Sequence, residues 1–391
     1  MISVPTALSI VSEVVYAPKV NTVSLKDANG LFLGENMISS IDMPPFRQSA
    51  MDGYALLLHD KNSYQIIGEV KAGDPDNYTL EPGQGVRIFT GARVPDDANT
   101  VVIQEKVIRS ENIITIDSEI HPNQNIRAVG EQIKKGDTSL PKGTKLTPAG
   151  IGFLAGLGVT KVEVYAPPNV AIITTGNELV SPGEILKEGQ IYESNSIQLE
   201  TVLQQLHIKT INKYVVQDEY ESTKETIRQA ISANDLILIS GGISVGDYDF
   251  VKEALSELET KELFYKIKQK PGKPLFFGTN NESMIFALPG NPASSLTCFY
   301  VYVLPIIQKM MGASKYGLSR TTKSLTTSFI KKGDRAQFLK ANVIGETVEI
   351  LEGQSSAMLY TYAVANALVY LPEDANSTEK GSEVETILLP Q

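Results

Sequence analysis

The sequence predicts a multidomain protein of the α/β plus β class, with a three-layer α/β/α domain and a mostly parallel sheet at its centre. Two observations support this prediction. Strand-like and helix-like segments alternate along residues 165–312, which is typical of crossover units between parallel strands. Short β-rich runs separated by Gly, Pro, Asp and Asn occupy residues 41–140 and 313–391 instead. The chain of 391 residues is long enough for about two to four domains.

The α/β domain is expected over residues 165–312. Its predicted strands read NVAIITT, NKYVVQ, DLILIS and SMIFALPG, and the apolar run LILIS suits a central strand buried on both faces. Its predicted helices read SNSIQLETVLQQL, ESTKETIRQAISA, DFVKEALSEL and NPASSLTCFYVYVLPIIQKM.

The remaining chain divides into three further units. Residues 41–140 are expected to form a β-rich insert domain, with the runs GYALLL, YQIIGEV, GVRIFTG, TVVIQEKV and NIITID. Residues 313–391 are expected to form a small C-terminal β-barrel domain. Residues 1–40 and 141–164 together form an N-terminal mixed/helical unit, with AGIGFLAGLGV helical. The chain begins with a predicted amphipathic helix that places Leu8, Val11, Val14 and Val15 on one face.

Composition excludes several classes of function. The net charge of −10 argues against nucleic-acid binding, and no apolar run reaches membrane-spanning length. The single cysteine, Cys298, excludes an intramolecular disulfide and fits a reducing, cytoplasmic compartment; its apolar surroundings predict an inert core thiol. The three histidines lie far apart in the sequence, which argues against a histidine zinc site or a Ser-His-Asp triad.

The stretch SGGISVGDYD follows the strand DLILIS and resembles a phosphate-binding loop. Gly241, Gly242 and Gly246 let the backbone approach an anion, and a helix start follows them. Asp247 stands where a P-loop has lysine, so the Walker interpretation fails, and helix capping explains this residue. Asp249 is less needed for capping, and a carboxylate beside a phosphate makes sense if Mg²⁺ lies between them.

Three other strand-to-loop segments offer polar groups. In TTGNEL, Thr175 and Gly176 can bind an anion and Glu178 can hold metal or water, although a plain polar turn explains them equally well. In KPGKP, two lysines surround a rigid turn, and in LPGNPAS a helix start offers free N–H groups. An exposed basic turn is the simpler explanation of KPGKP, whereas capping is sufficient for Asn291 but does not explain the whole LPGNP run. In IYESNS, capping by Ser194 or Asn195 is likewise sufficient.

Together the motifs resemble the molybdopterin molybdenumtransferase family, which contains the MoeA-like proteins and is related to the C-terminal domain of gephyrin. The resemblance covers nearly the full chain, and its motifs occur in the family's order. They read PPFRQSAMDGYA, RIFTGA, VVIQE, NIRAVGE, TTGNEL, GQIYESN, SGGISVGDYD, KPGKP and LPGNPAS. Each motif alone is moderately specific, whereas the ordered set is highly specific.

This resemblance implies an enzyme of molybdenum cofactor biosynthesis, a molybdopterin molybdotransferase. The implied reaction inserts molybdate into adenylylated molybdopterin, hydrolyses the adenylate with Mg²⁺, and releases AMP. The central domain is then molybdopterin-binding-like, and the chain forms a cytoplasmic homodimer with its cleft between subunits. The implied partners are a molybdopterin adenylyltransferase, other cofactor-biosynthesis proteins and apo-molybdoenzymes.

The resemblance also assigns residues to roles. The implied catalytic residues are Asp52, which acts from the partner subunit, Thr90, Glu178 and Asp249; the last two hold the metal or water. The implied substrate-binding residues are Thr175, Gly176, Ser194, Asn195, Gly241, Gly242, Ser244, Gly246, Lys270, Lys273, Pro289, Asn291, Pro292, Ser294, Arg335, Ser355 and Ser356.

The chain departs from the family pattern at two positions. Gln132 and Asn177 stand where the family often has aspartate, and amides bind metal less strongly than carboxylates. Three alternatives to the transferase stay open: a gephyrin-like scaffold, a cofactor carrier without turnover, and a molybdopterin adenylyltransferase. The last does not explain the motifs SAMDGYA and RIFTGA or the C-terminal β domain.

Overall fold

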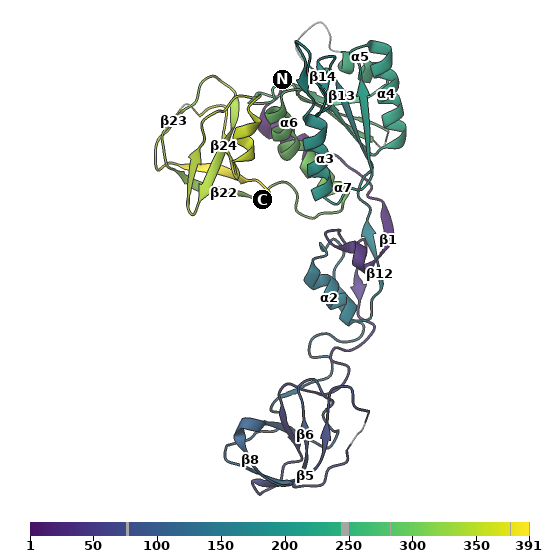
Figure 1. Ribbon diagram of the computed structural model, residues 1–391, viewed down its shortest axis with the longest axis vertical. Helices are drawn as coiled ribbons and strands as arrows, with labels where there is room; N and C mark the ends of the chain where they lie inside the picture. Colours follow the sequence, from purple (N-terminus) through teal and green to yellow (C-terminus); the bar gives the residue numbers. More distant parts are fainter. Residues whose placement is uncertain (76–77, 244–249, 282, 376, 391) are drawn as a thin grey trace.

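The computed structural model describes residues 1–75, 78–243, 250–281, 283–375 and 377–390. The molecule is elongated (Figure 1). The α/β domain and the C-terminal β domain lie side by side at one end, and the β-rich insert domain lies at the other. A slender stem joins the two ends. No described helix is both long and apolar enough to cross a membrane.

The central sheet of the α/β domain has six strands, in the order β16-β13-β17-β21-β20-β18. The first four are parallel and the last two antiparallel, so the predicted mostly parallel sheet is confirmed. The antiparallel pair at the edge was not predicted. The strands are β13 (Val170–Thr175), β16 (Ile211–Val216), β17 (Leu236–Ser240), β18 (Lys261–Tyr265), β20 (Phe276–Asn280) and β21 (Ser283–Leu288).

Helices cover both faces of this sheet, as Figure 1 shows. Alternate residues of one strand enter different cores: Val170 and Ile172 pack with α3, whereas Ala171 and Ile173 pack with α4 and α5. This period of two explains why the strands read as continuous apolar runs. The helices are α3 (Asn195–Gln205), α4 (Tyr220–Ala233), α5 (Phe250–Glu257), α6 (Pro292–Cys298) and α7 (Leu304–Met310).

The predicted long helix over residues 291–310 is interrupted. A five-residue π-helical turn, Phe299–Val303, separates α6 from α7. Pro305 lacks an N–H group and so gives no hydrogen bond to the carbonyl of residue 301. The wider π-helical turn precedes this proline and lets the chain continue into α7.

Helix α1 (Val4–Glu13) joins the start of the chain to the α/β domain. Ser3 caps it, accepting from Thr6 N at 3.2 Å, and Lys309 Nζ in α7 donates to the carbonyls of Ser12 and Val14 near its end. The helix ends before Val15, which is 90% exposed, so the predicted apolar face is wrong at that residue.

The stem consists of two chain segments that run in opposite directions. Strand β1 (Val20–Ser24) pairs antiparallel with β12 (Lys161–Tyr165), and β2 (Met37–Ile38) pairs with β11 (Thr138–Leu140). The predicted helix in this unit is α2 (Pro148–Gly156), and a 3₁₀ turn, Leu25–Ala28, packs against it.

The insert domain contains a six-stranded sheet in the order β7-β4-β6-β5-β9-β8. A further short pair, β3 (Gln48–Ser49) and β10 (Ile126–Arg127), lies beside it. The six strands are β4 (Gly53–Leu56), β5 (Ser63–Val70), β6 (Gln84–Ile88), β7 (Thr100–Ile103), β8 (Val107–Ser110) and β9 (Ile113–Ile116).

The C-terminal domain is a small closed barrel, as predicted, because β24 pairs with both β25 and β26. Strand β19 (Gln269–Lys270) comes from the α/β domain and pairs with β24, which joins the two domains. The other elements are β22 (Arg320–Leu325), β23 (Phe329–Ile330), β24 (Ala336–Ile344), β25 (Thr347–Ile350), α8 (Leu359–Ala363), β26 (Ala367–Leu371), β27 (Ser377–Thr378) and β28 (Glu383–Leu388). The four predicted domain boundaries stay predictions.

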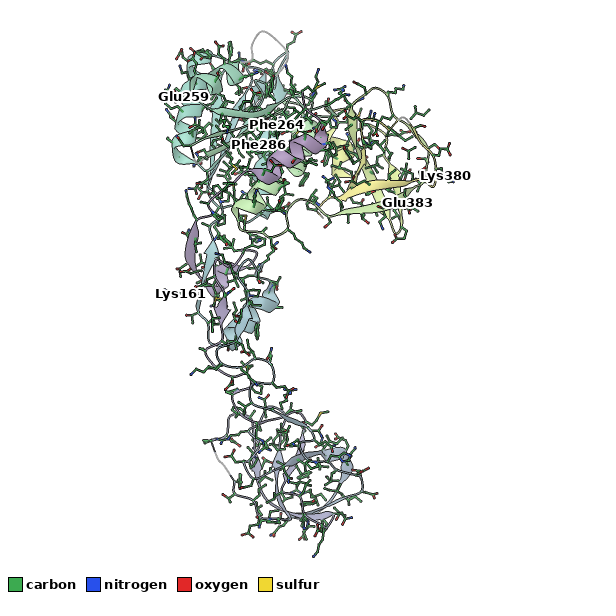
Figure 2. The ribbon with its side chains drawn as sticks, turned by 180° about the vertical axis from the view of Figure 1, so that it is seen from behind. Lys161, Glu259, Phe264, Phe286, Lys380 and Glu383 are labelled. Carbon is green, nitrogen blue, oxygen red and sulfur yellow. The ribbon has the colours of Figure 1, made fainter. Side chains whose placement is uncertain are left out.

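Aromatic packing anchors one face of the central sheet. The ring of Phe286 stacks on Phe277 with centroids 4.2 Å apart, and Phe277 contacts Phe264 at 5.5 Å. Figure 2 marks Phe264 and Phe286 within this domain. We expect Phe286→Ala to lower the free energy of unfolding of this domain by about 3–5 kcal/mol, because a buried ring leaves a cavity.

Urea unfolding followed by far-UV circular dichroism measures this change. Ile344→Ala is the control; that side chain is 73% exposed, and its loss is expected to change stability by less than about 0.5 kcal/mol. A loss below about 1 kcal/mol for Phe286→Ala contradicts the packing described here.

Candidate functional site

A cleft of about 660 Å³ opens at the carboxyl edge of the four parallel strands. The loops that follow β13, β16, β17 and β21 line it, and Ala357 of the C-terminal domain contributes to its wall. Ligands of open α/β sheets bind at this edge, because the loops beyond successive parallel strands converge there. The sequence placed most of its candidate residues in these loops.

Three of the loops are packed closely enough to form a backbone cradle. A Cβ on Gly241 would lie 2.5 Å from Thr175 O, and one on Gly242 would lie 2.9 Å from Thr175 Oγ1. A Cβ on Gly290 would lie 3.8 Å from the Cα of Gly241. Both Gly241 and Gly242 have positive φ, at 94° and 62°, which glycine adopts without strain. The contacts explain why this turn contains two glycines.

One buried polar atom in the cradle lacks a partner. Thr175 is 5% exposed, and within the described part of the chain its Oγ1 makes no hydrogen bond. A buried hydroxyl without a partner is costly, and it points to a ligand or water that completes its hydrogen bonds. Thr175 and Gly176 both line the cleft.

Asn195 joins the strand-end loops. Its Nδ2 donates to Ser240 Oγ at 2.8 Å and to Gly290 O at 2.7 Å. Helix α3 therefore begins with a residue that links the ends of β17 and β21. Ser194 is at the N-cap position but makes no side-chain capping bond; Glu193 accepts from Ser196 N at 2.8 Å instead. Asn195 consequently supports the cleft, beyond the capping that could explain it from sequence.

Carboxylates also line the cleft. Glu178 follows β13 and Asp218 follows β16, and both side chains belong to exposed residues. Sequence reasoning missed Asp218. The available signal was its position two residues beyond the end of a strand that neighbours β13 in the sheet. Its backbone N donates to Asn177 Oδ1 at 3.2 Å, so the amide at position 177 holds this loop in place.

The helix start at α6 connects the cleft to the barrel. Asn291 and Pro292 line the cleft at the N-terminus of α6, together with Pro289. The amide of Asn291 does not cap the helix; its Nδ2 donates to Ser356 Oγ at 3.1 Å. Ser294, one turn later, is only 2% exposed and does not line the cleft.

In the basic turn KPGKP the lysine side chains are exposed, whereas a buried side chain holds the backbone. Lys270 and Lys273 are exposed, and Pro274 next to them lines the cleft. Beneath them Gln269 is fully buried; its Nε2 donates to Pro271 O at 3.0 Å and to Gly272 O at 3.1 Å.

Residues beneath the turn hold Gln269 itself. The hydroxyl of Tyr302, in the π-helical turn, donates to Gln269 Oε1. A Cβ on Gly272 would lie 2.5 Å from Cys298 Sγ, so this glycine permits the close packing. Burial raises the pKa of the Cys298 thiol well above its usual range, in keeping with the inert core thiol expected from sequence.

The candidate residues of the barrel, Arg335 and the pair Ser355 and Ser356, lie in different places. Arg335 is half-buried, and its Nη1 lies 3.4 Å from Gln269 O, beside the basic turn. Ser355 is exposed and Ser356 is half-buried, in the loop that reaches Asn291. Neither Ser355 nor Arg335 lines the cleft itself.

Asp52 and Thr90 are together in the insert domain. Asp52 Oδ1 accepts from Thr90 N at 2.7 Å and from Thr90 Oγ1 at 2.8 Å. These hydrogen bonds, with the nearby charge of Arg87, lower the pKa of Asp52 below its ordinary value. Both residues are exposed, and their domain lies at the far end of the molecule from the cleft (Figure 1). Within one chain they form no hydrogen bond or ion pair with the other candidates that the structure describes.

Six residues of the motif SGGISVGDYD, 244–249, lie outside the described residues, and with them the predicted roles of Ser244, Gly246, Asp247 and Asp249. Among the described residues, no three His, Cys, Asp or Glu side chains gather to hold a metal ion. Glu178 and Asp218 at one cleft nevertheless fit Mg²⁺, which typically binds one or two carboxylates together with substrate phosphates.

Three family models match successive parts of the chain, and relatives match nearly all of it. Residues 2–158 match the MoeA N-terminal region (domain I and II), residues 171–309 a probable molybdopterin binding domain, and residues 323–389 the MoeA C-terminal region (domain IV). A protein of Haemophilus influenzae named molybdopterin molybdenumtransferase is 34% identical over 93% of this chain and 92% of its own. One of the same name from Nostoc is 34% identical over 94% of this chain and 88% of its own.

Solved structures give the same result. The crystal structure of the molybdopterin biosynthesis MoeA protein from Pyrococcus horikoshii matches 99% of this chain and 100% of its own, with a TM-score of 0.85 and 30% identity. A molybdenum cofactor biosynthesis protein from Pyrococcus furiosus, at 20% identity and a TM-score of 0.63, shares the fold. The chain therefore belongs to the MoeA family of molybdopterin molybdenumtransferases.

Proposed function

We propose that this protein inserts molybdate into adenylylated molybdopterin and releases AMP. The phosphoanhydride bond of the adenylate breaks with one water consumed. The two dithiolene sulfurs replace two oxide ligands of molybdate, and each oxide leaves as water after taking up two protons, which the dithiol and the solvent supply. The observation that supports this proposal most directly is the glycine cradle at Thr175, Gly241 and Gly290, which adjoins two carboxylates in one cleft.

The cradle suits the phosphates of the substrate. Glycines without Cβ atoms let backbone N–H groups approach phosphate oxygens, and the Thr175 hydroxyl, which has no partner among the described residues, supplies one more hydrogen bond. The exposed charges of Lys270 and Lys273 would attract molybdate or phosphate to this edge, although the chain as a whole has a net charge of −10.

The carboxylates would hold Mg²⁺ and water. When bound, Mg²⁺ would neutralise the pyrophosphate and polarise it towards attack. Glu178 and Asp218 are the described carboxylates available for this, since Glu193 is occupied by Ser196. Asp249 is proposed to join them, as the resemblance implies.

Asp52 and Thr90 would act on the cleft of a second subunit. They are exposed at the end of the molecule opposite their own cleft, so they reach a cleft only in another copy (Figure 1). A homodimer with two composite sites satisfies this requirement. We further propose a cytoplasmic location, with substrate received from a molybdopterin adenylyltransferase and cofactor passed to apo-molybdoenzymes.

The purified protein is expected to release AMP when it receives adenylylated molybdopterin, molybdate and Mg²⁺. Glu178→Gln and Asp249→Asn should each lower kcat by about a hundredfold or more, because each removes a group that positions metal or water. Chromatographic quantification of AMP measures this, and Glu188→Gln is the matched control, since Glu188 is exposed but does not line the cleft.

The same assay separates the alternatives. Substrate binding without AMP release contradicts the transferase and indicates a carrier or a scaffold. Formation of adenylylated molybdopterin from ATP and molybdopterin indicates an adenylyltransferase instead.

Mixed dimers test the shared site. Asp52→Ala and Glu178→Gln, each inactive alone, should together recover about half of the wild-type activity in isolated mixed dimers, because each mixed dimer has one intact site of two. Activity is measured on co-purified, differently tagged chains. Failure to recover activity in verified mixed dimers would falsify the composite site.

The Thr90 hydroxyl is expected to hold Asp52 in its charged form. Thr90→Val removes one of two hydrogen bonds to the carboxylate, so the pKa of Asp52 should rise towards its ordinary value while the Thr90 N–H bond keeps the rise partial. In the wild type the stabilisation is fully present above the ordinary pKa and is lost as pH falls through the lowered one. Carboxyl ¹³C NMR titration measures the shift; Ser110→Ala, an exposed change in β8, should leave it unchanged.

A further inference from the structure

Lys340 lies on β24 of the C-terminal barrel and is only 4% exposed. Its Nζ donates to three backbone carbonyls: Gly353 O at 2.9 Å, Ser355 O at 3.1 Å and Met358 O at 3.1 Å. An ammonium group has three donors, so the three acceptors satisfy it fully. One side chain thus gathers the carbonyls of a six-residue loop, 353–358, around a single positive charge.

The backbone of Lys340 binds the same loop. Its N donates to Gln354 Oε1 at 2.9 Å, and its carbonyl accepts from Gln354 Nε2 at 2.8 Å. Thr361 Oγ1 donates to Gly353 O at 3.1 Å, which closes the loop onto α8. The conformation of this segment therefore depends on Lys340 more than on any apolar side chain of its own, since most of its residues are exposed or half-buried.

This loop is the part of the barrel that forms the cleft. Ala357 lines the cleft, and Ser356 Oγ accepts from Asn291 Nδ2 at 3.1 Å. In Figure 1 the barrel containing β24 lies beside α6, at whose start Asn291 stands. A displacement of the loop would consequently move a wall of the cleft and break the bond to Asn291.

The charge of Lys340 is not balanced by a carboxylate. Within the described part of the chain no Asp or Glu forms an ion pair with its Nζ, and burial alone lowers its pKa from the ordinary value. A buried charge without a counter-charge is costly, although three carbonyl dipoles offset part of that cost. Such a charge favours the binding of an anion in the adjacent cleft, because a buried charge is screened less by salt than an exposed one.

We propose that Lys340 is a positioning residue for anion binding in the cleft. Its ammonium holds the 353–358 loop so that Ser356 meets Asn291, and its uncompensated charge favours a phosphate-bearing ligand beside that wall. The nature of the ligand rests on the proposed function. To that function the inference adds a role for Lys340, which lies outside the cleft.

The test compares Lys340→Met with a matched control, Lys331→Met. Lys331 is also buried in the barrel, at 7% exposure, and its Nζ donates to the carbonyls of Gly333 and Glu373, neither of which lines the cleft. Calorimetric titration measures the affinity for AMP and for pyrophosphate. Hydrogen exchange of the peptide covering residues 351–359 reports the loop, and thermal unfolding reports the barrel.

Lys340→Met is expected to weaken AMP binding by about tenfold, because the charged group and its hydrogen bonds to the loop are lost. It is also expected to speed hydrogen exchange in residues 351–359. Lys331→Met should change neither. Unchanged AMP affinity in Lys340→Met overturns the proposal, as does an equal loss in both variants, since that outcome would report general weakening of the barrel. A wild type that binds neither AMP nor pyrophosphate overturns it too.

A second variant covers the case in which Lys340→Met does not fold. Lys340→Ala is purified with n-propylammonium, which replaces the missing chain and charge, and the amine is then removed or exchanged for n-propanol. Loss of AMP affinity on removal, restored by the amine and not by the alcohol, supports the proposal. Unfolding on removal, or restoration by n-propanol, overturns it. AMP release by the wild type decides the proposed function separately from this comparison.

Discussion

The close packing of Gly241 against Thr175 is the constraint on which the cleft depends. The ends of β13 and β17 meet so tightly that a Cβ at position 241 would lie 2.5 Å from a backbone oxygen. Because neighbouring parallel strands end at one edge, this contact brings together backbone groups and a buried hydroxyl that no single segment contains. Asn195 then extends the assembly, through Ser240 and Gly290, to the loop after β21.

The exposed candidates of the cleft depend on buried polar side chains beneath them. Gln269 holds the carbonyls of the basic turn, and Lys340 holds those of the loop that contains Ser355 and Ser356. Each of these buried groups has its hydrogen bonds satisfied, which makes the backbone above it rigid. Lysines and serines at the surface can then face a ligand without the entropy cost of ordering a flexible loop.

The elongated shape separates the candidate residues into two groups. The cleft residues are at one end, and Asp52 with Thr90 is at the other, beyond a stem whose two chain segments are joined by β1 and β12 (Figure 1). A single copy therefore has two incomplete halves of the implied site. The two hydrogen bonds from Thr90 orient Asp52 and favour its charged form even at this exposed position.

Much of this protein was determined by its sequence alone. Alternating apolar runs predicted the parallel sheet, since strands buried on both faces need continuous apolar residues, and the ordered motifs identified the family and most cleft residues. Local patterns did not predict that Val15 lies beyond the end of its helix, that Pro305 accompanies a π-helical turn, or that Asp218 lines the same cleft as Glu178. Only the tertiary structure decided these points and the roles of Gln269 and Lys340, because their partners are distant in sequence or lie on the backbone, and backbone carbonyls look the same in every sequence.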